Sequence, residues 1–173
     1  MNMNMHVTEK DHILGPADAP VEIVEYADFQ CPYCGKAFHI MKDILKEQGD
    51  NIRFVFRNYP LEELHPYAVH AAVAAETASA QDKFWEMHDI LFENQKELDD
   101  AHLIEYARII DMDVKKFKED FGQERFVRKV QEDYDSGNKA GVEGTPTFFV
   151  NGQVYEGNWM TNEFPEYLKS LVK

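Results

Sequence analysis

The chain has 173 residues, of which 44% are hydrophobic and 13% aromatic, and its formal net charge at pH 7 is −14. This length and composition predict a globular chain with its own core and exclude a disordered protein. The excess of acidic residues argues against a nucleic-acid partner, because such a surface repels phosphate groups. No run approaches the roughly 20 apolar residues of a membrane span.

The first residues, MNMNMHVTEKDH, contain no apolar stretch followed by small residues, so the sequence as given shows no secretory signal peptide. We therefore expect a cytoplasmic location. If a signal has been removed from the sequence, a periplasmic or extracellular location is expected instead.

The first elements in chain order form one βαβ unit. Residues 21–28 are rich in β-branched and aromatic side chains, which favour a strand. From Cys34 apolar residues recur every three or four positions until Gly49, which predicts a helix. Residues 51–60 alternate as a second strand. A strand, a helix and a strand in this order predict a parallel pair with a right-handed crossover.

Helical patterns then fill most of residues 61–140. The predicted helices run from Pro66 to about Ala80, from Asp82 as a cap through residue 94, from Asp99 or Asp100 through residue 110, near 113–121, and near 123–138 with an end at Gly137 or Gly141. Strand character returns at 147–155, where Asn151 and Gly152 predict a tight hairpin, and a helix is expected at about 161–172.

Cys31 and Cys34 are the only cysteines, separated by Pro32 and Tyr33. A bridge between them would close too small a loop to stabilise the fold much. A C-x-x-C pair beside a βαβ pattern is typical of a redox-active disulfide. Because the pair falls where a strand ends and a helix begins, the positive end of the helix should lower the pKa of Cys31. We predict that Cys31 attacks and that Cys34, one turn further into the helix, resolves the mixed disulfide.

Three segments carry a resemblance to a known family: EYADFQCPYCGKAF, FRNYPL and GVEGTPTFFVNGQVYEG. They resemble the DsbA-like branch of the thioredoxin superfamily. The resemblance covers nearly the whole chain and implies an α/β, thioredoxin-like fold with an inserted all-helical domain. Residues 1–60 and 141–173 would form the thioredoxin-like domain, and residues 61–140 would form the insertion.

The resemblance also assigns roles to individual residues. It implies that the Thr145–Pro146 bond is cis and packs against the cysteines, so that the backbone of Thr145 can pair with an extended substrate. Pro32 and Tyr33 are expected to contact the substrate as well.

Glu25 lies where family members hold a buried acid beneath the cysteines, and it is predicted to exchange a proton with Cys34. Glu22 and Glu25 fall on opposite faces of the strand, so a solvated Glu25 stays an alternative. Arg57 is a candidate partner for Glu25.

These features predict a thiol–disulfide oxidoreductase that acts on protein thiols and disulfides through a mixed disulfide at Cys31. Family members that are the strongest oxidants have histidine at the position of Tyr33, so an intermediate pKa and redox potential are expected here. We expect a monomer without a bound cofactor or metal, and glutathione or a thioredoxin-type protein as redox partner.

Two alternatives stay open. C-P-Y-C is typical of glutaredoxins, which favours a glutathione-linked disulfide reductase. Alternatively, the cysteine pairs of two chains could hold zinc or a [2Fe–2S] cluster. A binding protein without redox activity is disfavoured because both cysteines are present.

Overall fold

A five-stranded sheet forms the centre of the molecule. The structure, a computed structural model, describes residues 5–173. Its strands are β1 (His12–Leu14), β2 (Val21–Ala27), β3 (Ile52–Asn58), β4 (Thr147–Val150) and β5 (Gln153–Val154). Its helices are α1 (Pro32–Gln48), the 3-10 helix η1 (Gly49–Asn51), α2 (Ala68–Ser79), α3 (Phe84–Glu93), α4 (Asp100–Ile109), α5 (Val114–Asp120), α6 (Glu124–Lys139) and α7 (Glu163–Ser170).

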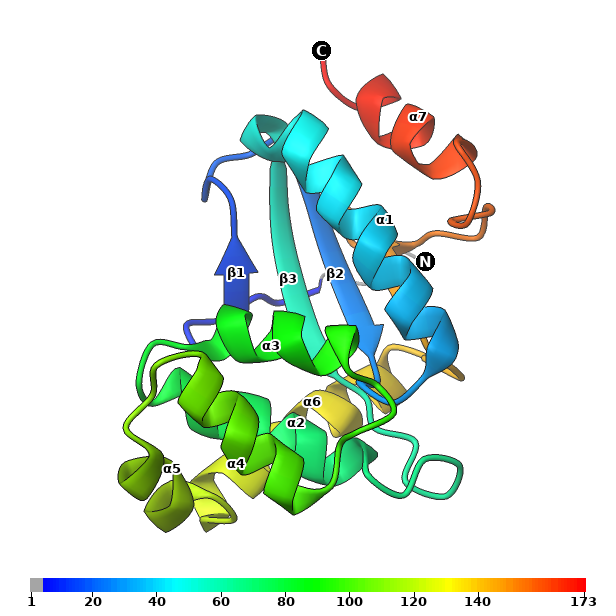
Figure 1. The fold of residues 1–173 in the computed structure, drawn as a ribbon. Helices are drawn as coiled ribbons and strands as arrows, with labels where there is room; N and C mark the ends of the chain where they lie inside the picture. The colour runs from blue at the N-terminus through cyan, green and yellow to red at the C-terminus, as the bar shows by residue number, and fades with distance from the viewer. Residues whose placement is uncertain (1–4) are drawn as a thin grey trace.

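The strand order is β1-β3-β2-β4-β5, and only the central pair, β2 and β3, is parallel. The predicted βαβ unit is therefore confirmed. β1 was not predicted, because its three residues, one of them histidine, follow a polar segment and carry no strand pattern. In Figure 1, α1 lies in front of the sheet, and the end of β2 and the start of α1 meet beside α3.

The two faces of the sheet are covered by different helices. Ile23, Phe54 and Phe56 point into the larger core, which they share with residues of α1 and α3. Val24 and Tyr26 point into a smaller core on the other face, where partly buried Tyr134 of α6 packs. Because side chains alternate along a strand, neighbouring residues of β2 meet different partners.

The helical segment forms as the sequence predicts, with local differences at its helix starts. α2 begins at Ala68, two residues after Pro66. Asp82 does not cap α3, because it adopts a positive φ of 57° and the cap position is Lys83. Gly141 follows the end of α6 with a φ of +86°, the left-handed conformation that glycine tolerates best.

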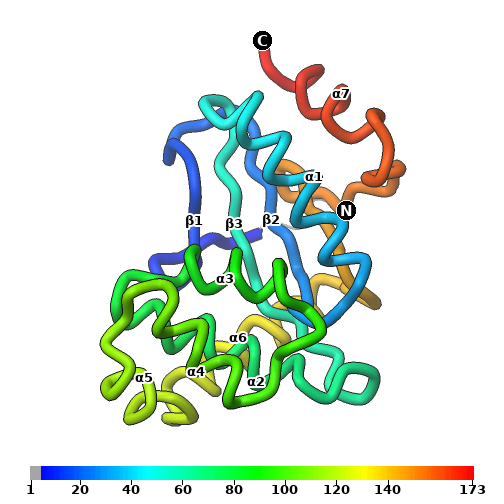
Figure 2. The backbone as a smooth tube through the Cα atoms, viewed as in Figure 1, coloured from blue at the N-terminus to red at the C-terminus, as the bar shows by residue number. Residues whose placement is uncertain are grey.

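Figure 2 shows the chain leaving the sheet after β3 and returning to it through α6. α6 contacts both α2 and β3, so it joins the helical segment to the sheet. The division into a domain of residues 1–60 with 141–173 and an inserted domain of residues 61–140 stays a prediction. None of the helices formed by residues 5–173 combines the length and apolar character of a membrane-spanning helix.

The predicted hairpin connects β4 to β5. Asn151 and Gly152 both have positive φ values, 49° and 82°, as a type I′ turn requires. The Asn151 side chain also accepts a hydrogen bond from the Glu22 backbone N–H at 2.8 Å, which attaches the turn to β2.

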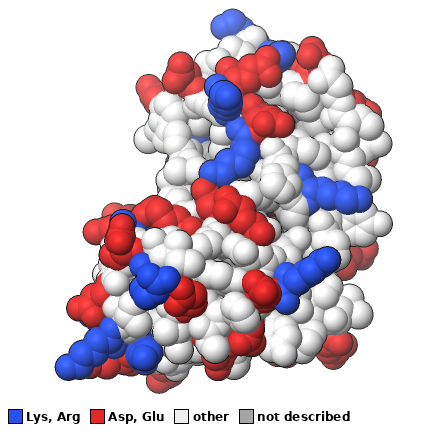
Figure 3. Space-filling view, in the orientation of Figure 1, with Lys and Arg blue, Asp and Glu red and all other residues white. Residues whose placement is uncertain are grey.

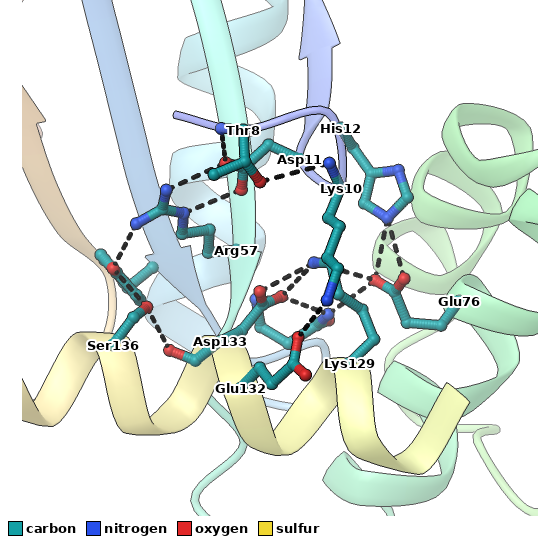
Figure 4. A network of polar contacts seen from close by, with 12 residues as sticks. Thr8, Lys10, Asp11, His12, Arg57, Glu76, Lys129, Glu132, Asp133 and Ser136 are labelled. Atoms are coloured by element: carbon teal, nitrogen blue, oxygen red, sulfur yellow. Dashed lines mark hydrogen bonds and ion pairs between the residues drawn. The ribbon is translucent and has the colours of Figure 1, made fainter. Parts of the chain in front are cut away.

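A buried polar network attaches the N-terminal segment to β3, α2 and α6 (Figure 4). Arg57 donates to both carboxylate oxygens of Asp11 at 2.9 Å. Glu76 lies 2.9 Å from a ring nitrogen of His12 and accepts a hydrogen bond from the Asn58 side chain at 2.9 Å. These contacts hold the segment that forms β1 beside β3.

Acidic and basic side chains are interspersed over the face drawn in Figure 3, with red patches more numerous than blue ones. Ion pairs that join exposed side chains, such as Arg128 with Glu124 on α6, contribute little stability in water. The surface charge therefore bears on solubility and partner choice more than on the fold.

Candidate active site

The two cysteines lie at the start of α1, where β2 has just ended. Cys31 is the cap residue of the helix, and its carbonyl accepts a hydrogen bond from the Gly35 N–H at 3.1 Å. Pro32 follows as the first helical residue, where the absence of an N–H group costs nothing. Both cysteines are reduced in this structure. Cys31 keeps 5% of its surface exposed and Cys34 none, so Cys31 is the thiol that a substrate reaches first.

Cys31 is strongly acidified. The Cys34 S–H hydrogen bond to the Cys31 sulfur is the largest cause that lowers the pKa of Cys31, from 9.0 to about 5, against the effect of burial. Thr145 and the backbone N–H groups of Tyr33 and Cys34 lower the pKa further. The value lies between the roughly 3.5 and 7 known for C-x-x-C sites, which agrees with the intermediate pKa expected from the sequence. At neutral pH Cys31 is therefore a thiolate.

Cys34 has the opposite character. Burial, its hydrogen bond to Cys31 and the negative charges at Cys31 and Glu25 raise the pKa of Cys34 well above its usual value. The Asp28 N–H donates to the Cys34 sulfur at 3.4 Å and opposes this effect only in part. Two neighbouring thiols thus have very different proton affinities, which is the arrangement that a nucleophile and a resolving thiol require.

Glu25 is buried on the face of β2 that points toward α1. The alternative prediction of a solvated Glu25 is therefore wrong. Burial, with a smaller contribution from the charge at Cys31, raises the pKa of Glu25 from 4.5 to about 8. Its Oε2 atom has no hydrogen-bond partner within residues 5–173. A carboxyl group with this pKa can both accept and release a proton near neutral pH.

The prediction that Arg57 pairs with Glu25 is wrong. In the parallel register Glu25 lies beside Phe56, whereas Arg57 lies beside Tyr26 on the opposite face of the sheet. Arg57 binds Asp11 there and donates to the Tyr26 hydroxyl at 2.8 Å. No cation among residues 5–173 lowers the pKa of Glu25, and burial is the largest cause of its shift.

The Thr145–Pro146 peptide bond is cis, as the resemblance implies. The Cys31 sulfur lies 3.7 Å from the Thr145 carbonyl oxygen, to which it donates a hydrogen bond when it is protonated, across 114 residues of sequence. The buried Thr145 hydroxyl has no partner within the described residues, so it is available to the Cys31 thiolate. The structure thus brings residues 145 and 146 to the cysteine pair.

Pro32 and Tyr33 lie on the outer side of the same site. Tyr33 is 54% exposed, and the Lys36 ammonium lies 5.4 Å from the centre of its ring. An exposed aromatic ring beside a reactive thiol can pack against an apolar side chain of an incoming peptide.

Two residues that sequence reasoning missed hold the active-site turn in place. The Gln95 side chain, from the segment after α3, donates to the carbonyls of Phe29 at 2.9 Å and Cys31 at 2.8 Å. The Asp28 carboxylate accepts from the Leu61 N–H at 2.9 Å and contacts a ring nitrogen of His65 at 2.7 Å. The helical segment therefore positions the turn that carries Cys31.

We expect Gln95→Ala to destabilise the fold by about 1–3 kcal/mol, because two buried carbonyls lose a donor. Gly35→Ala should destabilise it too, since its Cβ would lie 2.2 Å from Gln95 Oε1. Combining the two substitutions should cost less than their sum, because the clash disappears with the amide. Urea unfolding measures all three variants. Gln81→Ala, which removes an amide bound to Asp113, is the matched control, and strict additivity would contradict the contact.

No group of three or more histidine, cysteine, aspartate or glutamate side chains within residues 5–173 is arranged to hold a metal ion. The alternative of a metal shared by two chains stays a prediction.

The class of protein follows from the fold and the cysteine pair: a thioredoxin fold with a helical insertion and a C-x-x-C site. The family model described as Thioredoxin matches residues 7–170, and the chain belongs to this family.

Two curated relatives are the Na(+)/H(+) antiporter NhaA 3 of Salinispora tropica and the Na(+)/H(+) antiporter NhaA 1 of Salinispora arenicola. Each is 46% identical to this chain, and the two matches cover 86% and 87% of this chain, respectively. The match covers only 23% of each relative, so the chain spans about a quarter of their length.

The solved structures that resemble the chain include oxidised BdbD from Bacillus subtilis, with a TM-score of 0.81 and 29% identity over 94% of this chain and 93% of that one. The thiol-disulfide exchange protein α-DsbA2 from Wolbachia pipientis has a TM-score of 0.82, with 18% identity over 95% and 88% of the two chains. At 18% identity, the similarity to α-DsbA2 shows only that the two chains share a fold. The chain is DsbA-like, and these findings support a general thiol–disulfide oxidoreductase activity.

Proposed function

We propose that the chain exchanges its Cys31–Cys34 disulfide with thiols and disulfides of protein substrates through a mixed disulfide at Cys31. The observation that carries this proposal is the unequal pair: a thiolate that is reachable from solvent next to a buried, protonated thiol. A structural disulfide needs no such difference between its sulfurs.

In the reducing direction, the Cys31 thiolate attacks one sulfur of a substrate disulfide, and the other substrate sulfur leaves as a thiolate. Cys34 then loses its proton and attacks the Cys31 sulfur. The Cys31–Cys34 disulfide forms, and the second substrate sulfur leaves. In the oxidising direction the same steps run backwards, and Cys34 takes up a proton when it is released from the disulfide.

We assign Glu25 as the group that accepts the Cys34 proton and returns it. Besides Cys31, Glu25 is a titratable side chain whose charge raises the pKa of Cys34, and its own pKa of about 8 allows it to accept and return a proton at physiological pH. Because Glu25 and Cys34 are both buried, a proton that moves between them avoids the cost of two buried charges.

The substrate would lie over Cys31, between the cis-proline loop and the helix start. The backbone of Thr145 and Pro146 is beside the Cys31 sulfur and can pair with an extended chain. Pro32 and Tyr33 offer an exposed, mainly apolar surface on the other side. The acidic surface of the chain favours peptides that are not themselves strongly acidic.

The alkylation rate of Cys31 with iodoacetamide tests the unequal pair. We expect the rate to rise with a midpoint near pH 5 and to stay flat between pH 6.5 and 8, because the thiolate is the reactive form. In Cys34→Ala the midpoint should move to higher pH, since the largest stabilising hydrogen bond is lost. A midpoint near 8.5, the value of an ordinary thiol, would remove the basis of the proposal.

Equilibration with defined mixtures of reduced and oxidised glutathione addresses direction. An intermediate potential would fit either net direction, set by the compartment. A strongly reducing potential with fast turnover by glutathione would favour the glutathione-linked reductase, which the C-P-Y-C sequence also permits. The name of the NhaA relatives describes whole proteins of which this chain matches about a quarter.

A further inference from the structure

A cavity of about 370 Å³ lies between α1, α3 and the sheet. Phe38 of α1, Phe54 of β3 and Trp85 of α3 contribute aromatic walls. The volume and the mainly apolar lining fall in the range of small-molecule sites, which measure roughly 300–1,000 Å³. The proposed redox chemistry uses none of these rings.

Glu25 is among the residues that line the cavity. Glu25 is almost completely buried, and its Oε2 atom has no hydrogen-bond partner within the described residues. A buried polar atom without a partner is costly, and ligand sites commonly place such an atom where it orients a bound molecule. This observation is independent of the cavity's size and apolar walls.

The outer end is charged. Lys42 of α1 forms an ion pair with Asp89 of α3 beside the opening, and Lys46 lies on the same rim. In Figure 3 basic side chains along one edge of α1 stand above acidic ones over α3. Asp89 offsets the charge of Lys42, so only the charge of Lys46 is left at the rim, which is too little to select a strongly charged ligand.

We propose that this cavity binds a neutral aromatic molecule that carries one hydroxyl group, with its rings against the walls formed by Phe38, Phe54 and Trp85 and the hydroxyl at Glu25. Aromatic walls favour an aromatic body through offset and edge-to-face contacts. The carboxyl group holds its proton at neutral pH, so its partner must be uncharged and able both to donate and to accept a hydrogen bond. A hydroxyl group meets both conditions, whereas an ammonium group would require ionised Glu25.

The test uses the reduced full chain at pH 6.5 with 2-naphthol as the probe, followed by amide NMR shifts. We expect saturable binding of one molecule per chain, with the largest shifts in α1 and α3 around Leu45 and Trp85. 2-Methylnaphthalene, which replaces the hydroxyl by a methyl group, should bind at least tenfold more weakly. Absence of saturable binding, or shifts centred elsewhere, would overturn the site. Equal affinity for the two probes would overturn the assignment of the hydroxyl to Glu25.

Leu45→Trp should lower the affinity for 2-naphthol at least tenfold, because the larger side chain fills the cavity that Leu45 lines. Leu64→Trp is the matched control: Leu64 is 72% exposed and lines a different hollow, so the affinity should not change. If Leu45→Trp does not fold, the NMR shifts of the unmodified chain decide the question alone. Binding is measured without any thiol exchange, so this proposal and the proposed function can fail separately.

Discussion

Cys34→Ala is expected to abolish turnover while leaving the first chemical step intact. The Cys31 thiolate of this variant can still attack a substrate disulfide, but no second thiol is present to release the product. Steady-state exchange should therefore fall by at least about 10³-fold, as when one member of a catalytic unit is removed. Incubation with a disulfide-containing peptide, followed by mass spectrometry under non-reducing conditions, should show one peptide attached to each chain.

The comparison variant is Cys31→Ala, which keeps only the buried thiol. It should lose turnover equally and accumulate no adduct, because Cys34 is inaccessible and its pKa is raised. An adduct on Cys34 in Cys31→Ala, or residual turnover in either variant, would contradict the assignment of the two roles. The two cysteines are three positions apart, yet the expected products differ completely.

The parts of the fold that sequence predicted well are those with strong periodicity. β2, α1 and β3 carry apolar residues at spacings that only one kind of element satisfies, and Gly49 follows the end of α1 as expected. β1 has no such signal. It forms because His12 and its neighbour Asp11 are held by partners from α2 and β3, which lie far away in the sequence.

The candidate site also contains residues that the sequence predicts and residues that it does not. Cys31 and Cys34 are visible in the sequence because their chemistry depends on a local motif at a helix start. The contact of Thr145 with Cys31 could be expected only through the family resemblance. Gln95 gave no signal, since a glutamine in a helical segment has no pattern that points to a backbone carbonyl 64 residues earlier.

The error on Arg57 has a specific physical origin. The sequence showed that Arg57 and Phe56 lie on opposite faces of one strand, but not which of them shares a face with Glu25. That depends on the register between β2 and β3, which places Glu25 beside Phe56. A shift of one residue would have reversed the answer. The register between β2 and β3 therefore decides whether Glu25 can pair with Arg57, and the sequence alone does not give this register.

Glu25→Gln should change activity and stability in opposite directions. Loss of the proton acceptor is expected to slow the formation of the Cys31–Cys34 disulfide by about 10²–10⁴-fold, the usual range for a general acid or base. In the unmodified chain this step should accelerate as pH rises through about 8, where Glu25 ionises, and the acceleration should be absent in the variant. Stopped-flow measurement of disulfide formation between pH 6 and 9 provides both results.

The stability effect follows from the same pKa. Glu25 titrates near 4.5 when unfolded and near 8 when folded, so between these values the folded chain holds more protons than the unfolded chain. Its free energy of unfolding must then decrease as pH rises from about 4.5 to about 8, and the loss is complete above that range. At about 1.4 kcal/mol per pKa unit the loss is on the order of 3–5 kcal/mol.

Glutamine carries no titrating proton, so Glu25→Gln should be more stable than the unmodified chain at pH 8.5, and the difference should shrink toward pH 5. Urea unfolding of the reduced proteins at both pH values measures this. Glu22→Gln is the matched control, because Glu22 lies on the same strand in a partly exposed ion pair with Arg53. If Glu25→Gln forms the disulfide more slowly but is not more stable than the unmodified chain at pH 8.5, then ionisation of Glu25 does not destabilise the folded chain. Cys34 would then have to pass its proton to another group.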